Sequence, residues 1–323
     1  MADRVDVSVI IVNWNTRDLL LDVINSVKAT THSVRVEIIV VDNASVDGSV
    51  AAVRQSFPDV TVIVNPDNYG FARANNIGLR AAHGEAFCLV NTDIVALEGV
   101  IDELWTYLRT HPRVGAVGPR TLDRDGNIRR NVRRFPNLRN ALGDHLWLRH
   151  VIPGVFPGRS LPLPTFEFTH TADVLSGCFL MVRRDAVSDV GPLDESFFFY
   201  GEDTDWGLRF RQAGWECIYD ARARTVHLGG ASTAAHPLTY HLEMEKADLR
   251  YWRKHHGRGA VASYIAIRLV HNVVSVIAWS LIWLSSPGQR ERCTLKLKGG
   301  ATNAAWLLGR RSGTAIRWAG EAP

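Results

Sequence analysis

The sequence predicts a mostly parallel, doubly wound α/β sheet with flanking helices, followed by a hydrophobic and basic helical tail. Two observations predict the sheet: short apolar, β-branched runs alternate with segments of helical periodicity, and polar residues follow several of these runs. A third observation, the change in composition after about residue 250, predicts the tail. The chain has 323 residues, 46% of them hydrophobic and 22% charged, which is a globular composition with enough length for about two domains.

The first hundred residues contain the most regular alternation. Runs this apolar are typical of strands buried on both faces, as in parallel sheets. The expected strands are residues 7–12 (VSVIIV), 37–41 (EIIVV), 60–64 (VTVIV) and 86–90 (AFCLV). The expected helices between them are residues 18–28, 49–57 and 73–83, where apolar residues recur at helical spacing.

The alternation becomes less regular after Asp93. We expect a helix at residues 100–109, and strands at residues 114–117, 174–182 and 217–219. Residues 125–170 are rich in Arg, Pro and aromatics without a clean period, which predicts long loops with short helices. Loops of that length in a compact domain are usually functional or mobile.

The tail contains a long apolar segment at residues 260–284, interrupted by Arg268, His271 and Asn272. Its uninterrupted part, residues 273–284, is shorter than the ~20 residues needed to span a bilayer. Trp279 and Trp283 are of the type found at membrane interfaces. Basic residues flank the segment: Arg253, Lys254 and Arg258 before it, and Arg290, Arg292, Lys296 and Lys298 after it. We expect an in-plane or re-entrant membrane helix, with a buried helix of a small C-terminal subdomain as the alternative.

Charge is distributed unevenly along the chain. Residues 251–323 carry a net charge of +9 and the first 250 residues a net charge of −5. An acidic body with a basic tail disfavours nucleic-acid binding and favours contact of the tail with an anionic surface. The four cysteines are far apart, and the N-terminal segment enters a strand pattern without a signal-peptide pattern, so we expect the body to be cytoplasmic.

Acidic residues stand where the sheet would bind a ligand. Asp42 and Asp93 follow the second and fourth strands, Asp203 lies in the acidic stretch EDTD after the aromatic run FFFYG, and His227 lies in VHLGGAS. Each could be a helix cap or a core histidine. Together they predict a site at the carboxyl ends of the strands, where open α/β sheets bind ligands. Carboxylate and imidazole suit Mg²⁺ or Mn²⁺ holding a diphosphate, and the sequence contains neither a P-loop nor a GxGxxG motif after the first strand.

The chain resembles the inverting glycosyltransferases of family 2, which have the GT-A fold, and within them the rhamnosyltransferase-like branch. The motifs that carry the resemblance run in order from residue 7 to about residue 232: VSVIIVNWN, VVDNASVDGS, NPDNYGFARANNIG, NTD, LSGCFLMVRRDA, GPLDESFFFYGEDTDWGLRFRQAGW and VHLGGAS. The resemblance leaves the chain after about residue 255 largely uncovered.

The resemblance implies roles for individual residues. The nucleotide-sugar site would contain Asn13, Asp42, Gly70, Ala74, Asn75 and Asn91. Asp93 would be the metal-binding acid of a DxD-type motif in which Asn91 replaces the first acid, and His227 would complete the coordination. Asp203 would be the catalytic base, with Glu202 beside it as the second catalytic carboxylate, and Glu202 and Trp206 would shape the acceptor pocket.

The resulting hypothesis is a metal-dependent inverting transferase. It would move a sugar from a nucleotide-sugar donor, with dTDP-rhamnose as one candidate, to a lipid-linked or cell-surface glycan at the inner face of the cell membrane. We expect a GT-A domain at residues 1–250, with a donor half to about 95 and an acceptor half from about 96, and a tail at residues 251–323. The alternatives are a nucleotidyltransferase and a non-catalytic glycan- or lipid-binding protein. The arginines of NIRRNVRRF are read either as a grip for an acceptor pyrophosphate or as a solvated basic loop.

Overall fold

The computed structural model describes residues 5–229 and 237–309. The chain divides into two compact units. The sheet unit comprises Met1–Phe135 and Ser160–Ala234, and the helical unit comprises Pro136–Arg159 and Ala235–Pro323. This division differs from the expected boundary at residue 250, because residues 136–159 and the helix that starts at residue 237 group with the tail. Residues 230–232 of the VHLGGAS motif and the basic residues after 309 lie outside the described residues.

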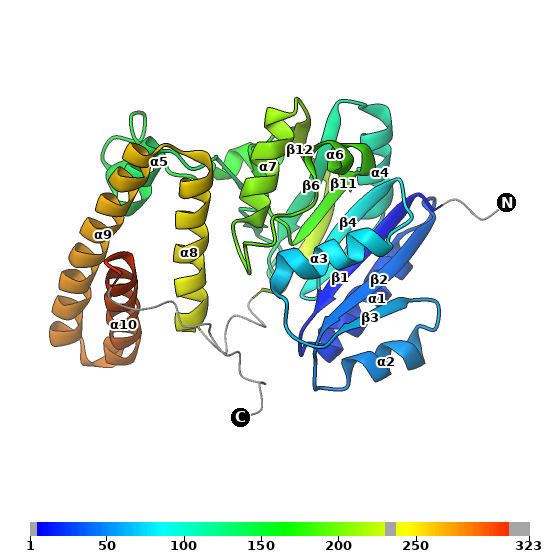
Figure 1. Ribbon diagram of the computed structural model, residues 1–323, viewed down its shortest axis with the longest axis horizontal. Helices are drawn as coiled ribbons and strands as arrows, with labels where there is room; N and C mark the ends of the chain where they lie inside the picture. Colours follow the sequence, from blue (N-terminus) through cyan, green and yellow to red (C-terminus); the bar gives the residue numbers. More distant parts are fainter. Residues whose placement is uncertain (1–4, 230–236, 310–323) are drawn as a thin grey trace. The chain divides into compact units, whose positions relative to one another are not determined.

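The sheet unit is built on one large sheet with the strand order β3-β2-β1-β4-β11-β6-β12-β5 (Figure 1). The first four of these strands are parallel to one another, as the sequence predicted: β1 (Val7–Asn13), β2 (Val36–Asn43), β3 (Thr61–Asn65) and β4 (Ala86–Asn91). In the parallel register, Asn13 at the end of β1 lies beside Asp42 in β2. The polar residues after these strands therefore meet at one edge of the sheet.

The second half of the sheet is mixed. β6 (Val114–Leu122) and β12 (Glu216–His227) are parallel to each other, and β11 (Phe179–Arg183) runs antiparallel to β4 and to β6, between which it lies. β5 (Ile94–Ala96) pairs antiparallel with β12. The remaining strands are two residues long: β7 (Ile128–Arg129), β8 (Val132–Arg133), β9 (His170–Thr171) and β10 (Val174–Leu175).

The single strand expected at residues 174–182 is two strands in the structure. β10 pairs with β8 in a separate small sheet, β11 joins the large sheet, and residues 176–178 (SGC) connect them. The expected strand at residues 217–219 is the start of the much longer β12. Both differences arise from long-range pairing, which a local apolar run does not specify.

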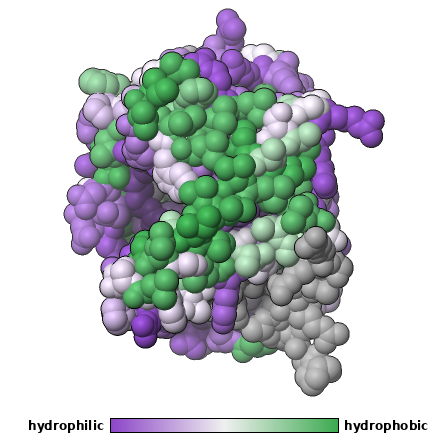
Figure 2. Space-filling view, turned by 90° about the vertical axis from the view of Figure 1, so that its left-hand side faces the viewer, coloured by the Kyte–Doolittle hydropathy of each residue, from purple (hydrophilic) through white to green (hydrophobic). Residues whose placement is uncertain are grey.

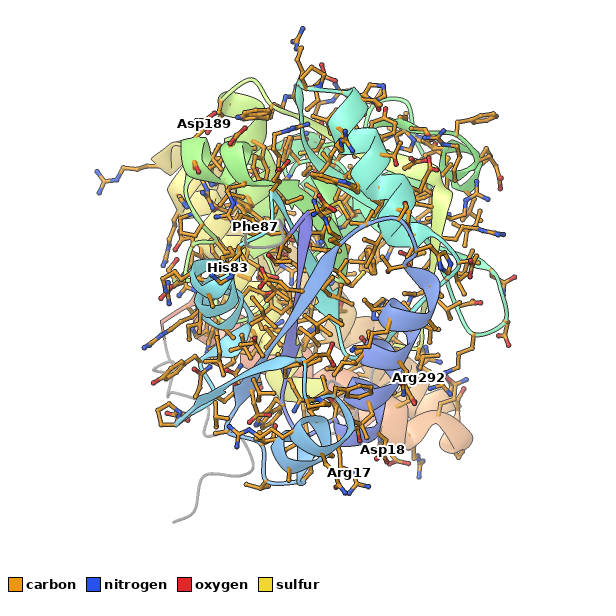
Figure 3. All side chains as sticks on the ribbon, turned by 90° about the vertical axis from the view of Figure 1, so that its right-hand side faces the viewer. Arg17, Asp18, His83, Phe87, Asp189 and Arg292 are labelled. Carbon is orange, nitrogen blue, oxygen red and sulfur yellow. The ribbon has the colours of Figure 1, made fainter. Side chains whose placement is uncertain are left out.

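Helices cover both faces of the sheet (Figure 1). One hydrophobic cluster includes residues of α1 (Arg17–Thr30), α2 (Ser49–Ser56) and α4 (Val100–Thr110), and the other includes residues of α3 (Gly70–Ala81), α6 (Arg184–Val190) and α7 (Glu202–Gln212). Successive strand residues point to opposite faces, so in β1 Val9 and Ile11 join the first cluster and Ile10 joins the second. The residues labelled in Figure 3 mark the two ends of the sheet. Arg17 and Asp18, just after the carboxyl end of β1, lie near the bottom, and His83 and Phe87, at the amino end of β4, lie higher.

The helical unit contains α5 (Leu138–His145), α8 (Pro237–His255), α9 (Arg258–Ser285) and α10 (Arg290–Leu307), together with the short 3-10 helices Leu148–His150 and Pro287–Gln289. A third 3-10 helix, Leu163–Glu167, belongs to the sheet unit. A buried ion pair between Arg268 of α9 and Glu245 of α8 ties the helices together, and Arg268 Nη1 also lies 2.7 Å from His145 Nδ1 of α5. The Trp252 and Tyr264 rings stack with centroids 4.7 Å apart. The helical unit thus has its own core.

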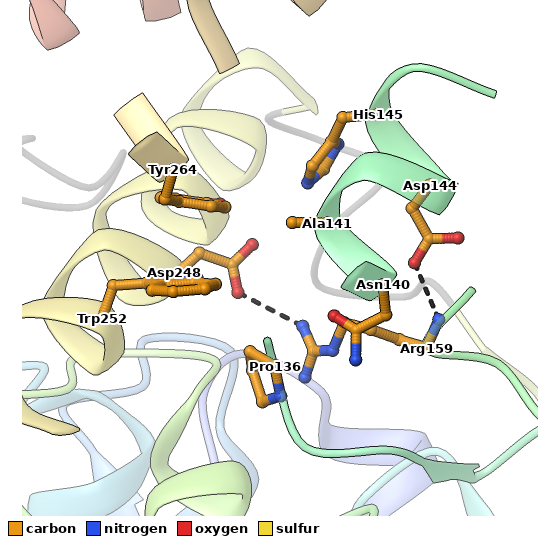
Figure 4. A pocket seen from close by; sticks show the side chains of 9 residues that line it. All are labelled: Pro136, Asn140, Ala141, Asp144, His145, Arg159, Asp248, Trp252 and Tyr264. Atoms are coloured by element: carbon orange, nitrogen blue, oxygen red, sulfur yellow. Dashed lines mark hydrogen bonds and ion pairs between the residues drawn. The ribbon is translucent and has the colours of Figure 1, made fainter. Parts of the chain in front are cut away.

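A small pocket lies within the helical unit between α5, α8 and α9 (Figure 4). Its lining includes Arg159, whose guanidinium lies 3.4 Å from Asp248 and whose backbone N–H donates to Asp144 at 2.8 Å. Two carboxylates and one guanidinium thus line the pocket, which does not favour an anionic ligand.

Candidate active site

The carboxyl ends of β1 and β2 form a buried polar corner. Asn13 and Asp42 are both buried, and the Asn13 amide donates to Asp42 Oδ1 at 2.8 Å and to Ser45 Oγ at 3.0 Å. The Ser45 backbone N–H donates to Asp42 Oδ2 at 2.8 Å. Ala44, between them, has φ +59°, a backbone conformation that costs a non-glycine residue free energy. Strained turns of this kind cluster at binding sites, which agrees with the predicted position of Asn13 and Asp42.

The start of α3 is joined to the aromatic run of residues 197–200. The Phe71 backbone N–H donates to Phe198 O at 2.8 Å. Gly70 has φ +76°, and a Cβ there would lie 2.4 Å from the same carbonyl oxygen, so only glycine fits. The Asn43 side chain donates through Nδ2 to Gly70 O at 3.1 Å, and its Oδ1 accepts from Asn65 Nδ2 at 2.9 Å. The NPDNYGF and FFFYGED motifs are therefore neighbours in space.

Two predicted nucleotide-site residues of α3 are inside the packed structure. Ala74 belongs to the hydrophobic cluster on this face of the sheet, and Asn75 is buried with its amide donating to Phe71 O at 2.9 Å. Asn76, which the sequence analysis did not single out, is the residue that ties α3 to the next segment, since its amide donates to Leu193 O at 2.8 Å. The helix N-terminus, rather than the side chains of Ala74 and Asn75, faces the loops of the site.

Asp93 and His227 come together although they are 134 residues apart. His227 Nε2 lies 3.1 Å from Asp93 Oδ2, and the Leu228 backbone N–H donates to Asp93 O at 2.8 Å. The two side chains are 18% and 15% exposed, so both can be reached from solvent. Burial lowers the pKa of His227, but the hydrogen bond to Asp93 and the interaction with Cys178 outweigh it and raise the pKa to about 9.

This pair would supply two positions of an octahedral metal site only when His227 loses its proton, because a metal binds the neutral imidazole. Ligand atoms about 2.1 Å from Mg²⁺ and at right angles to each other lie about 3 Å apart, close to the observed separation of Asp93 Oδ2 and His227 Nε2. Among the described residues, no group of three His, Cys, Asp or Glu side chains is placed to hold a metal. Two protein ligands are usual where a diphosphate and water fill the other positions.

The acidic stretch EDTD begins α7 after two residues with positive φ. Tyr200 has φ +70° and Gly201, the N-cap, has φ +84°. Asp203 is nearly buried, with Oδ1 accepting from the Thr204 backbone N–H at 2.7 Å and Oδ2 accepting from Arg133 Nη2 at 2.9 Å. Two consecutive left-handed residues fix the direction in which the first turn of α7 presents its carboxylates.

Glu202 is the unusual member of this cluster. It is buried, and its Oε2 has no hydrogen-bond partner within the described part of the chain. Burial and the neighbouring Asp203 raise the pKa of Glu202 to about 8, against a smaller opposing effect of Arg133. Trp206, one turn later, is buried in the hydrophobic cluster with its indole N–H donating to Gly191 O at 3.0 Å. It supports the first turn of α7 from inside and presents no surface to an acceptor.

Sequence reasoning missed the specific role of the arginines before residue 135. Arg133 pairs with Asp203, and Arg129 Nη1 donates to the His227 carbonyl oxygen at 3.0 Å. Arg134 donates to Ser160 O at 3.3 Å, whereas Arg130 is exposed. The NIRRNVRRF stretch is thus part of the site's framework rather than only a solvated loop. The repeated arginine pairs were the one sequence signal that could have indicated this.

Residues 176–178 connect the two halves of the site. The Asn91 backbone N–H donates to Cys178 O at 2.9 Å, which places this segment beside the end of β4. A Cβ on Gly177 would lie 3.4 Å from the Phe71 ring and 4.0 Å from Asp203 Cβ. The structure therefore gathers Asn91, Phe71 and Asp203 around one short connection, which the sequence analysis had read as the middle of a strand.

Comparisons with known proteins agree on one family. The profile described as "Glycosyl transferase family 2" matches residues 8–191. An N-acetylglucosaminyl-diphospho-decaprenol L-rhamnosyltransferase of Mycobacterium tuberculosis is 32% identical over 220 residues, which are 64% of this chain and 70% of the relative. The low-salt glycan biosynthesis hexosyltransferase Agl10 of Haloferax volcanii is 26% identical over 213 residues, 64% of this chain and 62% of the relative.

Solved structures with the same fold include two metal-bound transferases. The mannosyltransferase PcManGT of Pyrobaculum calidifontis, in complex with GDP-Man and Mn²⁺, has a TM-score of 0.56 at 16% identity, covering 94% of this chain and 88% of its own. GalNAc-T7 with UDP, GalNAc and Mn²⁺ has a TM-score of 0.56 at 15% identity, covering 78% of this chain and 50% of its own. These likenesses confirm the predicted GT-A fold.

Proposed function

The chain belongs to glycosyltransferase family 2, and from that premise we propose that it is a metal-dependent, inverting hexosyltransferase acting on a lipid-linked or cell-surface glycan. The observation that carries the proposal is the gathering of Asn91, Phe71 and Asp203 around residues 176–178, with the Asp93–His227 pair beside the end of β4. In this arrangement the residues that would bind the metal and its diphosphate, and the residue that would accept the proton of the hydroxyl, lie on one edge of the sheet.

The donor is a nucleotide sugar, with dTDP-rhamnose as the first candidate because a relative 32% identical is a rhamnosyltransferase. We assign the nucleotide to the corner of Asn13 and Asp42, whose polar atoms the turn at Ala44 holds in place. Asn91, Gly70 and the start of α3 complete the donor side. Ala74 and Asn75 contribute by packing α3, since both are buried.

Asp93 and His227 would hold Mg²⁺ or Mn²⁺, which neutralises charge on the departing diphosphate when bound. Two relatives in fold were solved with Mn²⁺ and a nucleotide or nucleotide sugar, which supports this role. Arg129 donates to the His227 carbonyl oxygen and so helps to hold the backbone that carries the imidazole.

Asp203 is the proposed general base. A sugar hydroxyl becomes a good nucleophile as it loses its proton, and a carboxylate beside the reacting centre accepts that proton at Oδ2 or Oδ1. The two oxygens are held by Arg133 and by Thr204, which fixes the orientation of the carboxylate. Glu202, with its pKa raised to about 8, is mostly protonated near neutral pH, so it adds little negative charge beside Arg133.

The acceptor is proposed to be a glycan on a polyprenyl diphosphate at the inner face of the cell membrane. The printed name of the M. tuberculosis relative describes such a lipid-linked acceptor. Arg130 is exposed beside the site framework and is the arginine of the NIRRNVRRF stretch available to an acceptor diphosphate. The basic, apolar tail supports a membrane location.

A thermal-shift panel of nucleotide sugars with Mn²⁺ tests the donor side. The cognate donor at 100 times its Kd should stabilise the protein by about 2.7 kcal/mol, and Asp93→Ala should abolish this metal-dependent shift and detectable transfer without changing the fold. Asp185→Ala, at an exposed carboxylate close to Arg183, which pairs with Ala86 at the other end of β4, is the matched control and should behave like the wild type.

Three outcomes would replace the proposal. Unchanged activity in EDTA, together with a fully active Asp93→Ala, would remove the metal from the mechanism. Donor binding without any release of nucleotide, with or without a polyprenyl-diphosphate glycan, would favour a non-catalytic binding protein. Incorporation of the nucleotide itself into a product would favour a nucleotidyltransferase.

A further inference from the structure

Helix α9 presents a long apolar stripe to solvent. Its 18-residue apolar window has a mean hydropathy of 1.8, and only 17% of that window is buried inside the protein. The exposed members recur every three or four residues, so they share one face of the helix. They are Val270, Val273, Val274, Ile277, Leu281 and Leu284, each between 42% and 67% exposed. Figure 2 shows hydrophobic residues gathered in a broad continuous region on the face that it views.

The opposite face of α9 is committed to the helical unit. Tyr264, Ile267, Arg268 and Asn272 are buried there, and Arg268 is bonded to Glu245 and His145. α10 packs closely along α9, because a Cβ on Gly300 would lie 3.3 Å from the Val276 side chain. The apolar stripe is therefore not the core-facing side of the helix, which removes the alternative of a buried core helix for this face.

Indole–cation pairs lie on the side of α9 that faces α10, opposite the stripe. The Arg292 guanidinium lies 5.7 Å from the Trp279 ring centroid, and the Arg290 guanidinium lies 4.6 Å from the Trp283 ring centroid. Lys296 and Lys298 follow on α10. An apolar face on one side of a helix with indoles and cations on the other side is the arrangement of a helix that lies at the surface of an anionic membrane.

We propose that α9 lies in the plane of an anionic lipid bilayer, with the stripe from Val270 to Leu284 in the acyl boundary and Arg290 and Arg292 at the headgroups. The length of α9 does not decide between lying in the plane and spanning, because 28 residues of helix extend about 42 Å. The packing decides. A spanning α9 would carry α10, with Lys296 and Lys298, and the buried Arg268 into hydrocarbon, where cations are strongly disfavoured.

A lipid surface fits this face better than a second copy of the chain. The bilayer supplies both an apolar layer for the stripe and negative charge for the basic tail. A second copy would supply another apolar stripe but only the same net positive charge, so the +9 charge of residues 251–323 would gain no opposite charge. The inference deepens the membrane location in the proposed function, yet it does not depend on the transfer reaction, because it concerns binding alone.

Flotation of the full-length protein with vesicles tests the inference. The protein should float with vesicles of phosphatidylcholine and phosphatidylglycerol at low salt and be released by alkaline carbonate. Ile277→Asn with Leu281→Asn should weaken binding at least about 100-fold, since two apolar side chains no longer enter the lipid. Arg290→Gln with Arg292→Gln should weaken it about 30-fold on anionic vesicles, at about fivefold per charge, with little change on pure phosphatidylcholine.

The control is a matched pair of exposed apolar residues in the sheet unit. Val64→Asn with Phe168→Asn removes comparable exposed surface and should leave flotation unchanged. Resistance to carbonate extraction would overturn the in-plane arrangement in favour of spanning. Failure to float at low salt would overturn the lipid occupant. In that case a dimer by light scattering that the Ile277 and Leu281 changes dissociate would assign the stripe to a second copy. Donor binding in the thermal-shift panel is unaffected by either outcome, so this inference and the proposed function can fail separately.

Discussion

Each unit of the protein holds a buried carboxylate against an arginine, and the two clusters differ in how completely they are satisfied. In the helical unit, Glu245 uses both oxygens on Arg268, and the two side chains are 1% and 10% exposed. In the sheet unit, Arg133 binds one oxygen of Asp203 and is 38% exposed, while the adjacent Glu202 keeps an unpartnered buried oxygen. The first is closed to solvent, and the second is open on the arginine side.

This difference separates a structural ion pair from a candidate site. Burial raises the pKa of both Glu245 and Glu202, but Arg268 opposes the increase at Glu245 through hydrogen bonds, whereas at Glu202 a second carboxylate adds to it. A pair that only holds helices together has no reason to keep an unsatisfied oxygen. A cluster that must accept a proton from a substrate needs an accessible carboxylate, with charged groups beside it that adjust its pKa.

The largest expected effect is on turnover at Asp203. Asp203→Asn should lower kcat about 10²- to 10⁴-fold with donor Kd unchanged, because it removes the proton acceptor without touching the donor side. Glu245→Gln, the matched change in the structural pair, should leave kcat near normal. Both variants need kcat, donor Kd and a melting temperature. Near-normal kcat with a lowered melting temperature in Asp203→Asn would show that the acidic first turn of α7 only caps the helix. The Asp203 cluster would then be as structural as the Glu245–Arg268 pair.

The second effect is on stability in the helical unit. Arg268→Met should cost about 3–5 kcal/mol of unfolding free energy, because it leaves the Glu245 carboxylate buried without its partner. The double variant Glu245→Leu with Arg268→Met should recover most of this loss, since apolar replacements of a buried pair are often neutral. Urea unfolding measures both. A loss below about 1 kcal/mol in Arg268→Met would show that the pair is not structural.

The third effect concerns the open pair. Arg133→Gln should lower kcat about tenfold or more by removing one charge-assisted hydrogen bond that orients Asp203, and Arg133→Lys should restore part of it. Its cost in stability should stay within about 1 kcal/mol, because the arginine is well exposed. The pH profile of kcat/KM should also move to higher pH in Arg133→Gln, since loss of the cation raises the pKa of the facing carboxylates. An unshifted profile with lowered stability would make Arg133 a packing residue.

The fourth effect is the pH dependence of the stability contributed by Glu202. The pKa of Glu202 is about 8 in the folded protein and ~4.3 in an unfolded chain, so between these values the folded state binds the extra proton. The contribution of Glu202 to the free energy of unfolding is therefore largest below about pH 4. It decreases as the pH rises towards 8, by at most about 1.4 kcal/mol per pH unit. Glu202→Gln cannot titrate.

The stability of Glu202→Gln relative to the wild type should accordingly increase between pH 5 and pH 8 in urea unfolding. Glu291→Gln, at an exposed carboxylate of α10, should show no such trend. A constant difference between wild type and Glu202→Gln over this range would mean that Glu202 is ionised throughout, like an ordinary paired carboxylate.

Much of the sheet unit was predictable because its first half is locally encoded. The strands at residues 7–12, 37–41 and 86–90 were found from short apolar runs. Asp42 and Asp93 could be placed at one edge because parallel strands end on the same side. The site residues were thus predicted as positions, while their individual roles remain proposals.

The sequence by itself determined the fold class, the edge of the sheet that holds the polar residues and the apolar character of α9, because periodicity and composition are local properties. Only the tertiary structure decided that Arg133 faces Asp203, that residues 176–178 leave the strand to lie beside Asn91, and that residues 136–159 join the helical unit. It also decided which face of α9 is exposed. These features depend on partners tens of residues away, and such pairings are selected by packing and hydrogen bonding across the whole unit rather than by any local pattern.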